Sequence, residues 1–308
     1  MLTVVMATCN GATTLPKVLS AYCQLQTPAG GWSLIVVDDG SVDDTSKILE
    51  RYKGQLPLKT LRQKRSGKNA ALNLALQHVL ADQETELVVF TDDDATPQPD
   101  WLIRLAECAV AQPEFAIFGG RIVPDWGAKP DEWILRLVPL GITYAITEAT
   151  DGPVDPRFIW GANMAVRRSV FDAGHRFNTA IGPSGKAYAM GSETEFSRRM
   201  TAAGYRTWFC HSAVIGHYIR PEQLTEEFAL ARSYRFGRGA RAQASDDSVV
   251  TVAGIPRWML GKYLRELLGA IRAWITQDKD TLFRKRWELR YLRGYFYEAK
   301  QLRKLKVT

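Results

Sequence analysis

Acidic side chains follow two segments whose composition is typical of buried β-strands. Leu34–Val37 runs into Asp38 and Asp39, and Leu87–Thr91 runs into Asp92–Asp94. The carboxyl ends of parallel strands meet at one edge of a sheet, where the ligands of open α/β proteins bind, so we expect these carboxylates to lie close together. Carboxylates gathered in this way repel one another unless a divalent cation or a hydrogen-bonding ligand lies among them.

The spacing of Asp92 and Asp94 indicates a site for a metal ion together with a diphosphate. Side chains two residues apart in an extended segment point the same way, so these two carboxylates are expected to share a ligand face while Asp93 points elsewhere. Mg²⁺ and Mn²⁺ prefer oxygen ligands and are commonly held by one or two carboxylates with substrate phosphates. For Asp38 and Asp39 the alternative is that they only cap turns and helices.

Four basic residues surround Gly67, at the start of a predicted helix. They are Arg62, Lys64, Arg65 and Lys68. Cations near a helix N-terminus can meet the phosphates of an anionic ligand, because the free backbone N–H groups there also favour negative charge. The alternative is a solvated basic loop.

The elements that must position these groups alternate between strands and helices through the first 125 residues. The expected strands are Leu2–Ala7, Leu34–Val37, Leu58–Leu61, Leu87–Phe90 and Phe115–Phe118, and the expected helices are Leu15–Leu25, Asp43–Tyr52, Gly67–Leu80 and Asp100–Val110. Strands that alternate with helices of this length argue for βαβ units and a mostly parallel sheet. Short, continuous apolar strands fit a sheet that is covered on both faces.

The second half of the chain is less regular. Tryptophan, proline and glycine are frequent between residues 126 and 190, which indicates loops and short elements. Beyond them we expect helices at Glu193–Ala203 and Pro221–Ala244, strands at Tyr205–Phe209 and Ala213–Ile215, a polar break at Ser245–Ser248, and two basic, aromatic-rich helices at Ile255–Ile275 and Asp280–Leu305.

Composition excludes several classes of protein. Of the 308 residues, 46% are apolar and 24% are charged, which is typical of a globular protein and rules out a disordered chain or a small disulfide-rich fold. The four cysteines contain no CxxC pair and no zinc spacing, so we expect reduced thiols in a cytoplasmic protein. They are Cys9, Cys23, Cys108 and Cys210. We expect no signal peptide, because Met1–Met6 leads straight into a strand pattern, and no apolar run reaches membrane-spanning length.

The positive charge of the chain is concentrated near its C-terminus. Residues 256–308 contain 14 basic and 5 acidic residues, a net charge of +9, so residues 1–255 carry −2 of the total of +7. The first of the two predicted helices there has an apolar stripe with basic flanks, and the second continues the pattern with Arg284–Arg286 and Tyr295–Tyr297. Such helices suit the headgroup layer of a membrane, and the alternative is packing on the protein body or on a second subunit. We expect no nucleic-acid partner, since no binding motif accompanies the charge.

Several segments together resemble the family 2 glycosyltransferases, the inverting enzymes with the GT-A fold. They are Thr3–Asn10, Leu34–Ser41, Gly67–Asn73, Val88–Asp94 with Pro97 and Trp101-Leu102, Gly161–Arg167 and Gly191–Phe196, within residues 2–240. The resemblance implies an α/β fold with a Rossmann-like, mostly parallel sheet flanked by helices. It also implies a nucleotide-sugar-binding half at 1–125 and an acceptor-binding half at 126–245, followed by a basic amphipathic helical tail at 246–308.

The resemblance further implies a set of donor-binding residues. They comprise a segment at the end of the first strand that contacts the nucleoside, and two aspartates near the nucleobase. A lysine near the nucleobase or the phosphates and the first two residues of the aspartate run complete the set. These residues are Ala7, Thr8, Asn10, Asp38, Asp39, Lys68, Asp92 and Asp93. Asp94 and His217 are the implied ligands of a Mg²⁺ or Mn²⁺ ion.

Glu193 is the implied catalytic base, with one departure from the family pattern. Most members have the aspartate of a Glu-Asp pair at this place, whereas this chain has Ser192-Glu193, whose carboxylate reaches one methylene farther. The base takes the proton of the acceptor hydroxyl as this attacks the anomeric carbon, and a single displacement inverts the configuration. Glu195 is the second candidate, although it faces away from Glu193 on a helix.

Aromatic and basic residues elsewhere are further candidates for binding. Trp160 and Tyr188 suit sugar rings, although core packing is the commoner use of tryptophan. Arg232, Arg235 and Arg238 recur along one predicted helix and can face phosphates or simply water.

We therefore predict a metal-dependent, inverting glycosyltransferase that moves a sugar from a nucleoside-diphosphate donor, with a UDP-sugar favoured, to a saccharide or lipid-linked hydroxyl acceptor. Its expected role is polysaccharide or glycolipid synthesis in the cytoplasm, with peripheral contact of residues 256–308 with the inner face of the cell membrane. One alternative is a non-catalytic scaffold that binds sugar nucleotides. Another is an aspartyl phosphatase, because Asp92–Thr96 also fits a D-x-D-x-T pattern, although the later pair Asp246-Asp247 follows no strand-like run.

Overall fold

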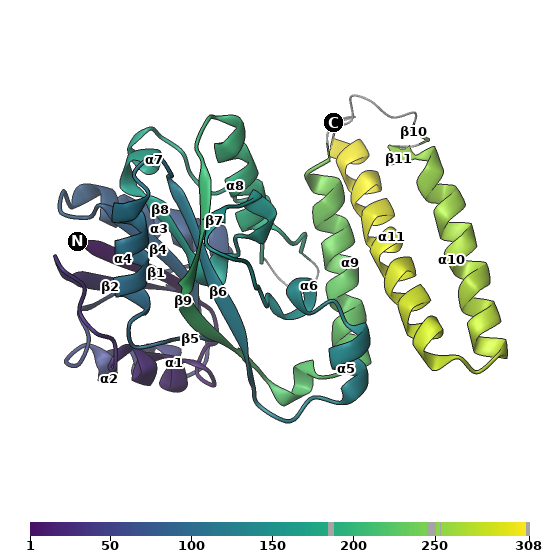
Figure 1. Cartoon of the computed structure of the whole chain (residues 1–308), viewed down its shortest axis with the longest axis horizontal. Helices are drawn as coiled ribbons and strands as arrows, with labels where there is room; N and C mark the ends of the chain where they lie inside the picture. Colours follow the sequence, from purple (N-terminus) through teal and green to yellow (C-terminus); the bar gives the residue numbers. More distant parts are fainter. Residues whose placement is uncertain (184–187, 245–250, 253, 306–308) are drawn as a thin grey trace. The chain divides into compact units, whose positions relative to one another are not determined.

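The computed structural model describes residues 1–183, 188–244, 251–252 and 254–305. The chain forms two compact units, whose elements are labelled in Figure 1. The first, which we call the sheet unit, comprises Met1–Asp125, Ala145–Ala180 and Ser192–Ile219. The second, the helical unit, comprises Trp126–Tyr144, Ile181–Gly191 and Arg220–Thr308.

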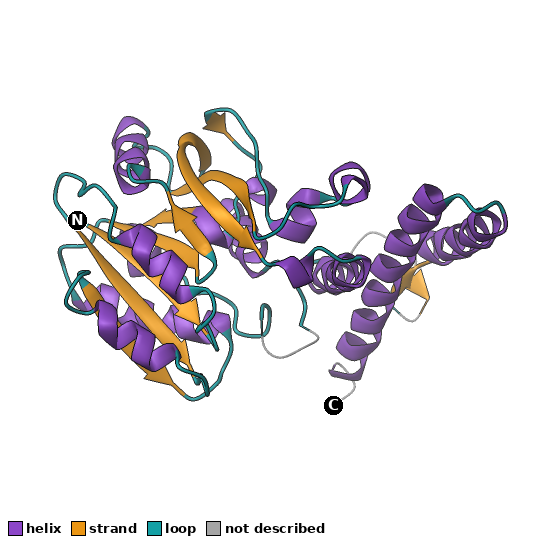
Figure 2. Cartoon of the chain, turned by 90° about the horizontal axis from the view of Figure 1, so that it is seen from below, coloured by secondary structure: helices purple, strands orange, loops and turns teal. Residues whose placement is uncertain are grey.

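Within the described residues, nine strands form one sheet in the order β3-β2-β1-β4-β8-β6-β9-β5, with β7 paired to β9. Their bounds are β1 Leu2–Thr8, β2 Trp32–Asp39, β3 Leu58–Gln63, β4 Leu87–Asp92, β5 Ala95–Pro97, β6 Ile117–Trp126, β7 Gly152–Pro153, β8 Met164–Arg167 and β9 Thr207–Ile219. Strands β3, β2, β1 and β4 pair in parallel, and β8 continues the sheet antiparallel to β4. The predicted α/β fold, a sheet flanked by helices, is confirmed (Figure 2).

The strand β1 separates two apolar cores, one on each face of the sheet. Val4 and Met6 lie in the core that includes residues of α1 (Leu15–Tyr22) and α4 (Trp101–Ala111). Val5 lies in the core that includes residues of α3 (Lys68–Ala81). Successive side chains of a strand point to opposite faces, so a continuous apolar run is what a sheet covered on both faces requires. The helices of this unit are α1 Leu15–Tyr22, α2 Thr45–Tyr52, α3 Lys68–Ala81, α4 Trp101–Ala111, α7 Arg168–Asp172 and α8 Ser192–Ala202.

The strand β9 differs most from its prediction. The sequence predicts two strands around a polar interruption, whereas the structure has one strand, Thr207–Ile219. Polar residues continue in the strand because they find partners there: the His211 N–H donates to Asp151 Oδ1 at 2.9 Å, and His211 Nδ1 lies 2.7 Å from the Ala149 carbonyl oxygen. The short strands β5, β7 and β8 were also absent from the prediction, since each is too short to show a pattern of its own.

Two of the four cysteines are oxidised, so the expectation of reduced thiols is wrong for them. Cys108 in α4 and Cys210 in β9 form a disulfide with their Cα atoms 6.3 Å apart. They are separated by 102 residues, and only the packing of α4 on β9 brings them together. Cys9 and Cys23 are free thiols. The cysteines therefore give no support to a cytoplasmic location, which stays a prediction.

The helical unit contains three long helices, with α11 between α9 and α10 (Figure 1). Its described elements are α5 Glu132–Leu137, α6 Leu140–Tyr144, the 3-10 turn Pro221–Gln223, α9 Glu226–Ala242, β10 Thr251–Val252, β11 Ile255–Pro256, α10 Arg257–Ile275 and α11 Lys279–Leu305. The two predicted C-terminal helices are confirmed, and the first begins two residues later because Ile255–Pro256 pairs with β10. The predicted polar break at Ser245–Ser248 lies outside the described residues.

Glycines allow α9 and α11 to approach each other closely. A Cβ atom on Gly237 would collide with the Tyr291 carbonyl oxygen, and one on Gly294 would collide with the Tyr234 carbonyl oxygen. These backbone contacts make α11 an integral part of the unit. Among the described helices, none has both the length and the apolar character that crossing a bilayer requires.

Candidate active site

The ends of β1, β2 and β4 bring predicted site residues to one edge of the sheet. In the parallel register Thr8 pairs with Asp38, and Ala7 pairs with Asp92, so residues of three strands lie side by side. Helix α3 begins at this edge with Lys68, whose ammonium group reaches Asp92. The carboxyl edge of a parallel sheet is where such folds bind ligands, and this edge is therefore the candidate active site.

The aspartate run turns at the end of β4. β4 ends at Asp92, and a turn at Asp93 and Asp94 leads into β5, so the extended geometry expected for this run is wrong. Asp93 Oδ2 accepts a hydrogen bond of 2.5 Å from Thr8 Oγ1. The turn gives each of the three carboxylates a different partner.

Asp94 lies beside His217, which β9 supplies. The two residues come together because β5 pairs antiparallel with β9, so that Ala95 lies opposite His217. His217 Nε2 is 3.5 Å from Asp94 Oδ2, and the Tyr218 N–H donates to the Asp94 carbonyl oxygen at 2.8 Å. The structure therefore juxtaposes the two implied metal ligands, 123 positions apart in the numbering of the chain.

Lys68 joins the strand-end aspartates to the implied base. Its Nζ donates to Asp92 Oδ1 at 2.6 Å and to Glu193 Oε1 at 2.8 Å. The side chains of Lys68 and Glu193 are only 15% and 16% exposed, so this three-residue ion cluster is largely removed from water. Burying a charge costs free energy unless an opposite charge lies beside it. Here the Lys68 ammonium supplies that opposite charge to both carboxylates.

The electrostatics of this cluster keep Glu193 ionised. Burial opposes ionisation of Glu193, but the Lys68 ammonium and its hydrogen bond outweigh burial and hold the pKa of the carboxyl below its ordinary value. Burial and the neighbouring Asp94 charge raise the pKa of Asp93 to about 7, and burial raises the pKa of Asp92 as well. Glu193 is thus ionised at neutral pH, whereas the buried, crowded carboxylates of Asp92 and Asp93 hold protons more tightly than free aspartates do.

A glycine makes room for Glu193. Gly161 starts the 3-10 turn Gly161–Asn163, and a Cβ atom at this position would collide with the Glu193 carboxylate. The sequence analysis placed Gly161 in an acceptor-side segment without a specific role. The role of Gly161 follows from the short distance between its backbone and the Glu193 carboxylate, and only the fold brings these two residues together.

Asp38 and Asp39 organise the loops of the site. Asp39 accepts hydrogen bonds from the backbone N–H groups of Ser66 and Gly67, at 2.7 and 2.8 Å. Asp38 Oδ1 accepts from the Ser41 N–H at 2.8 Å. Both aspartates are almost fully buried, so their side chains hold the loop before α3 and the loop after β2, which is the turn-capping alternative of the sequence analysis.

The remaining candidates divide between the two units. In the sheet unit, Asn10 Oδ1 accepts from the Val42 N–H at 2.9 Å. Glu195 forms an ion pair with Arg199 at 2.9 Å, which turns it to a different partner from that of Glu193. Trp160 packs against an apolar core, which is the alternative that the sequence analysis gives to binding a sugar ring.

Tyr188 and the three arginines belong to the helical unit and contact one another or α11. The Arg235 guanidinium lies 5.2 Å from the ring centre of Tyr188, and Arg232 Nη1 donates to the Tyr188 hydroxyl at 3.4 Å. Arg238 pairs with Glu298 of α11 at 2.7 Å. Cys9, which the sequence analysis did not place in the site, is near Asp38, Asp39 and Asp93, and burial raises the pKa of its thiol.

The residues present fit a small, hard cation that is shared with a substrate. Among the described residues, no group of three or more histidine, cysteine, aspartate or glutamate side chains is arranged to hold a metal ion by itself. Asp94 and His217 offer one oxygen and one nitrogen donor, and the crowded carboxylates around them supply excess negative charge. Mg²⁺ and Mn²⁺ are commonly held by one or two carboxylates with substrate phosphates, so this pair fits such an ion.

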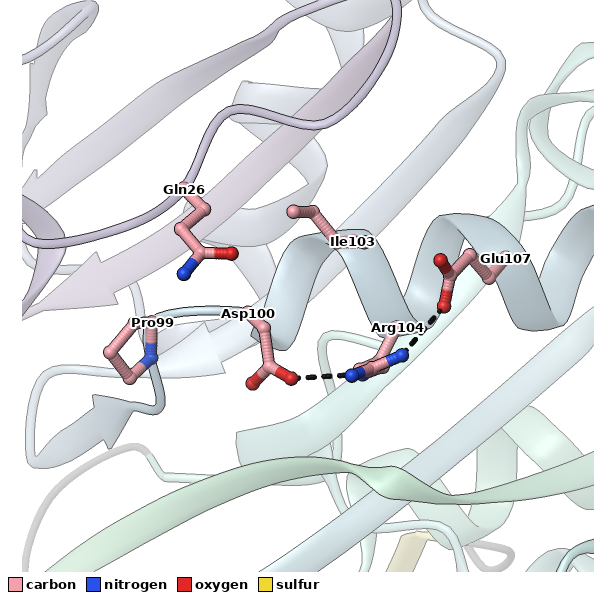
Figure 3. Close-up of a pocket in the computed structure, with 6 residues that line it drawn as sticks. All are labelled: Gln26, Pro99, Asp100, Ile103, Arg104 and Glu107. Carbon is pink, nitrogen blue, oxygen red and sulfur yellow. Dashed lines mark hydrogen bonds and ion pairs between the residues drawn. The ribbon is translucent and has the colours of Figure 1, made fainter.

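A separate surface pocket of about 490 Å³ lies along α4 (Figure 3). It is lined by Gln26, Pro99, Asp100, Ile103, Arg104 and Glu107. Arg104 bridges the two acidic residues of the pocket, with contacts of 2.8 Å to Asp100 and 3.1 Å to Glu107. The charged residues of this pocket are therefore paired with one another, and the pocket contains none of the candidate site residues.

Comparison with known proteins decides the family. The sequence profile described as "Glycosyl transferase family 2" matches residues 3–174. The chain belongs to glycosyltransferase family 2. The match spans the strand ends, Lys68 and the aspartate run, so the family predicted from these motifs is confirmed.

A curated relative of this chain is a glucosyl-dolichyl phosphate glucuronosyltransferase from Haloferax volcanii. It is 27% identical over 176 residues, which cover 53% of this chain and 54% of the relative. The chain thus spans about half the length of this relative.

Solved structures show the same fold over nearly the whole chain. A mannosyltransferase from Pyrobaculum calidifontis, solved with GDP-Man and Mn²⁺, superposes with a TM-score of 0.63 at 19% identity, covering 96% of this chain and 87% of the other. TarS from S. aureus, solved with UDP-GlcNAc, gives a TM-score of 0.54 at 15% identity, covering 97% and 92%. The GT-A fold of this chain is therefore shown.

Proposed function

We propose that the protein is a metal-dependent, inverting glycosyltransferase that moves a sugar from a nucleoside-diphosphate donor to a hydroxyl acceptor. The observation that carries the proposal is the Lys68 ammonium held between Asp92 and Glu193, at 2.6 and 2.8 Å. It joins the residues implied for the donor to the residue implied as base. Family membership and the fold support the same activity.

Glu193 acts as the general base in this mechanism. The acceptor hydroxyl gives its proton to the Glu193 carboxylate while its oxygen forms a bond to the anomeric carbon. The bond from that carbon to the diphosphate breaks, and the electron pair leaves with the diphosphate. Such proton transfer contributes about 10²–10⁴-fold in rate. The ion pair with Lys68 keeps Glu193 unprotonated, as a base requires.

Lys68 and the start of α3 face the charge that develops on the leaving diphosphate. The hydrogen bonds from Ser66 and Gly67 to Asp39 fix the loop that leads into α3, whose N-terminal backbone N–H groups favour anions. A Mg²⁺ or Mn²⁺ ion held by Asp94 and His217 would add charge neutralisation at the diphosphate. The Lys68 ammonium group has three N–H donors, so it would contact a phosphate oxygen of the donor while it keeps its hydrogen bond to Glu193.

The proposed classes of donor and acceptor rest on the ligands and names of similar proteins. The solved structures with the same fold hold GDP-Man or UDP-GlcNAc, and we retain a UDP-sugar as the favoured donor. The name of the Haloferax relative specifies a glucosyl-dolichyl phosphate, which supports a lipid-linked acceptor beside a saccharide one. Polysaccharide or glycolipid synthesis, with peripheral contact of residues 256–308 with the membrane, remains part of the proposal.

Substitution of Glu193 tests the assignment. Glu193→Gln should preserve thermal stabilisation by Mn²⁺ with the best nucleotide sugar and reduce transfer by about 10²-fold or more. The matched control is Glu195→Gln, on the same helix, which should retain most of the activity. Transfer that survives Glu193→Gln but is lost in Glu195→Gln would move the base to Glu195.

The non-catalytic scaffold is the second candidate, and one observation keeps it open. The chain has Ser192-Glu193 where most family members have a Glu-Asp pair. Nucleotide-sugar binding without any transfer or donor hydrolysis, across a panel of saccharide and lipid-linked acceptors, would favour the scaffold. The phosphatase alternative gains no support from the family match, and its second aspartate pair, Asp246-Asp247, lies outside the described residues.

A further inference from the structure

The helices α10 and α11 are both basic and contain aromatic residues, but they bury their apolar residues differently. The large apolar residues of α11 are mostly buried between α9 and α10, as Leu292 at 0% and Tyr295 at 6% exposure show. The apolar residues of α10 remain largely exposed. Leu260, Leu264, Leu268, Ile271, Trp274 and Ile275 are between 41% and 67% exposed.

These exposed residues form one continuous face, which we call the α10 stripe. Positions 260, 264, 268, 271 and 275 recur at intervals of three or four residues, which places their side chains in a row along one side of the helix. Met259, Ala270 and Ala273 occupy the opposite side and are buried. Trp258 and Trp274 stand near the two ends of α10 and are 56% and 65% exposed.

Charge around the α10 stripe is positive. Arg257, Arg265 and Arg272 are exposed on the same helix. The acidic residues nearby are held by basic partners: Glu266 pairs with Lys285 at 2.9 Å, and Glu288 pairs with Lys262 at 2.7 Å. The surface that fits this helix must therefore be apolar at its centre and anionic at its edge.

We propose that the α10 stripe is a docking surface for an anionic lipid bilayer. α10 would lie in the plane of the interface, with its leucines, isoleucines and tryptophans at the boundary of headgroups and acyl chains and its arginines on lipid phosphates. This inference extends the proposed function, but it is measured without donor or acceptor. The docking surface and the glycosyl transfer can therefore fail separately.

A second copy of the chain fits the α10 stripe less well. Two copies that met through this face would bring the arginines of one α10 against those of the other. The only acidic residue of α10, Glu266, is already paired with Lys285, so it offers no compensating charge. Like charges brought together across an interface are unfavourable, whereas an anionic bilayer supplies opposite charge over the whole helix.

Vesicle co-sedimentation of the full chain tests the proposal. Vesicles of phosphatidylcholine with about one third phosphatidylglycerol should bind the protein, and vesicles of phosphatidylcholine alone should bind it at least roughly tenfold more weakly. The double variant Leu264→Glu and Leu268→Glu should abolish binding to the mixed vesicles. Val110→Glu is the matched control, because Val110 is an 82% exposed apolar residue on α4. It should bind as the wild type does.

A second variant separates charge from apolar contact. Arg265→Gln with Arg272→Gln should weaken binding to the anionic vesicles by about fivefold for each arginine, since each basic residue near an anionic surface contributes about that factor. The control pair Arg51→Gln with Lys129→Gln removes two exposed charges elsewhere and should change binding little. Thermal unfolding curves that match the wild type would show that each variant is folded.

Two results would overturn the proposal. The first is equal binding of the wild type and the Leu264→Glu, Leu268→Glu variant to anionic vesicles. The second is a wild-type dimer, seen by sedimentation velocity, that binds no vesicles and becomes monomeric in this variant. That outcome would assign the α10 stripe to a second copy of the chain.

Discussion

The strand-end site and the α10 stripe use charged residues in opposite ways. In the site, a single lysine lies between two carboxylates, and the pairs are mostly removed from water. On α10 the exposed charges have one sign and border an apolar face. A charge that is buried must be paired within the protein, whereas exposed charges of one sign are available to a ligand outside it. Substitutions should therefore affect folding and chemistry in the first region, and only association in the second.

Lys68→Met should have the largest effect, because it leaves Asp92 and Glu193 without their shared counter-charge. Breaking a buried ion pair from one side costs about 3–5 kcal/mol of stability, and transfer should fall with it. Chemical denaturation and a transfer assay measure the two effects. Lys47→Met, whose side chain is 76% exposed on α2, is the control and should change neither. An unchanged free energy of unfolding for Lys68→Met would contradict the pairing.

Asp94→Ala should remove the metal-dependent part of donor binding. A ligand present at about 100 times its dissociation constant stabilises a protein by about 2.7 kcal/mol, and this stabilisation by Mn²⁺ with a nucleoside diphosphate should disappear. The measurement is thermal unfolding with and without the metal ion. Asp100→Ala, at the N-cap of α4 and outside the candidate site, is the control. Retained metal-dependent stabilisation in Asp94→Ala would remove this residue from the site.

Gly161→Ala should displace the base without removing it. The added methyl group would collide with the Glu193 carboxylate, and a displacement of about 1 Å at a reacting group can cost about 10²-fold in rate. Transfer kinetics should show a lower kcat with donor affinity preserved. Gly54→Ala, where an added Cβ meets no neighbour within 4 Å, is the control. Wild-type kcat in Gly161→Ala would show that the base does not need this space.

Leu264→Glu should have the smallest effect on the protein itself. The side chain is 57% exposed, and substitutions at such surface positions usually change stability by about 0.5 kcal/mol or less. Thermal unfolding and transfer to a saccharide acceptor in solution should both match the wild type. A large loss of stability would mean that the α10 stripe packs within the protein, and the comparison between the two regions would fail.

Local sequence patterns were sufficient to predict the elements that are long enough to show an apolar run or a helical period. The apolar runs before Asp38 and Asp92 predicted β2 and β4, and the two basic helices at the C-terminus were placed within two residues of their observed starts. Short strands such as β5 and β8 escaped prediction, because three or four residues show no period and are held by pairing with distant strands. The turn at Asp93 and Asp94 was not predicted either, because it depends on the pairing of β5 with the distant strand β9.

The amino-acid sequence by itself determined the family, the strand-end aspartates and the residue types of the site, because these depend on local order and spacing. Only the tertiary structure decided that Lys68 meets Glu193 across 125 residues, that Cys108 meets Cys210, and that α11 is buried while α10 is exposed. Both C-terminal helices are basic and contain aromatic residues, so their difference in burial arises because α11 packs between α9 and α10. Pairings between distant segments follow from how the elements pack, and no local pattern records that packing.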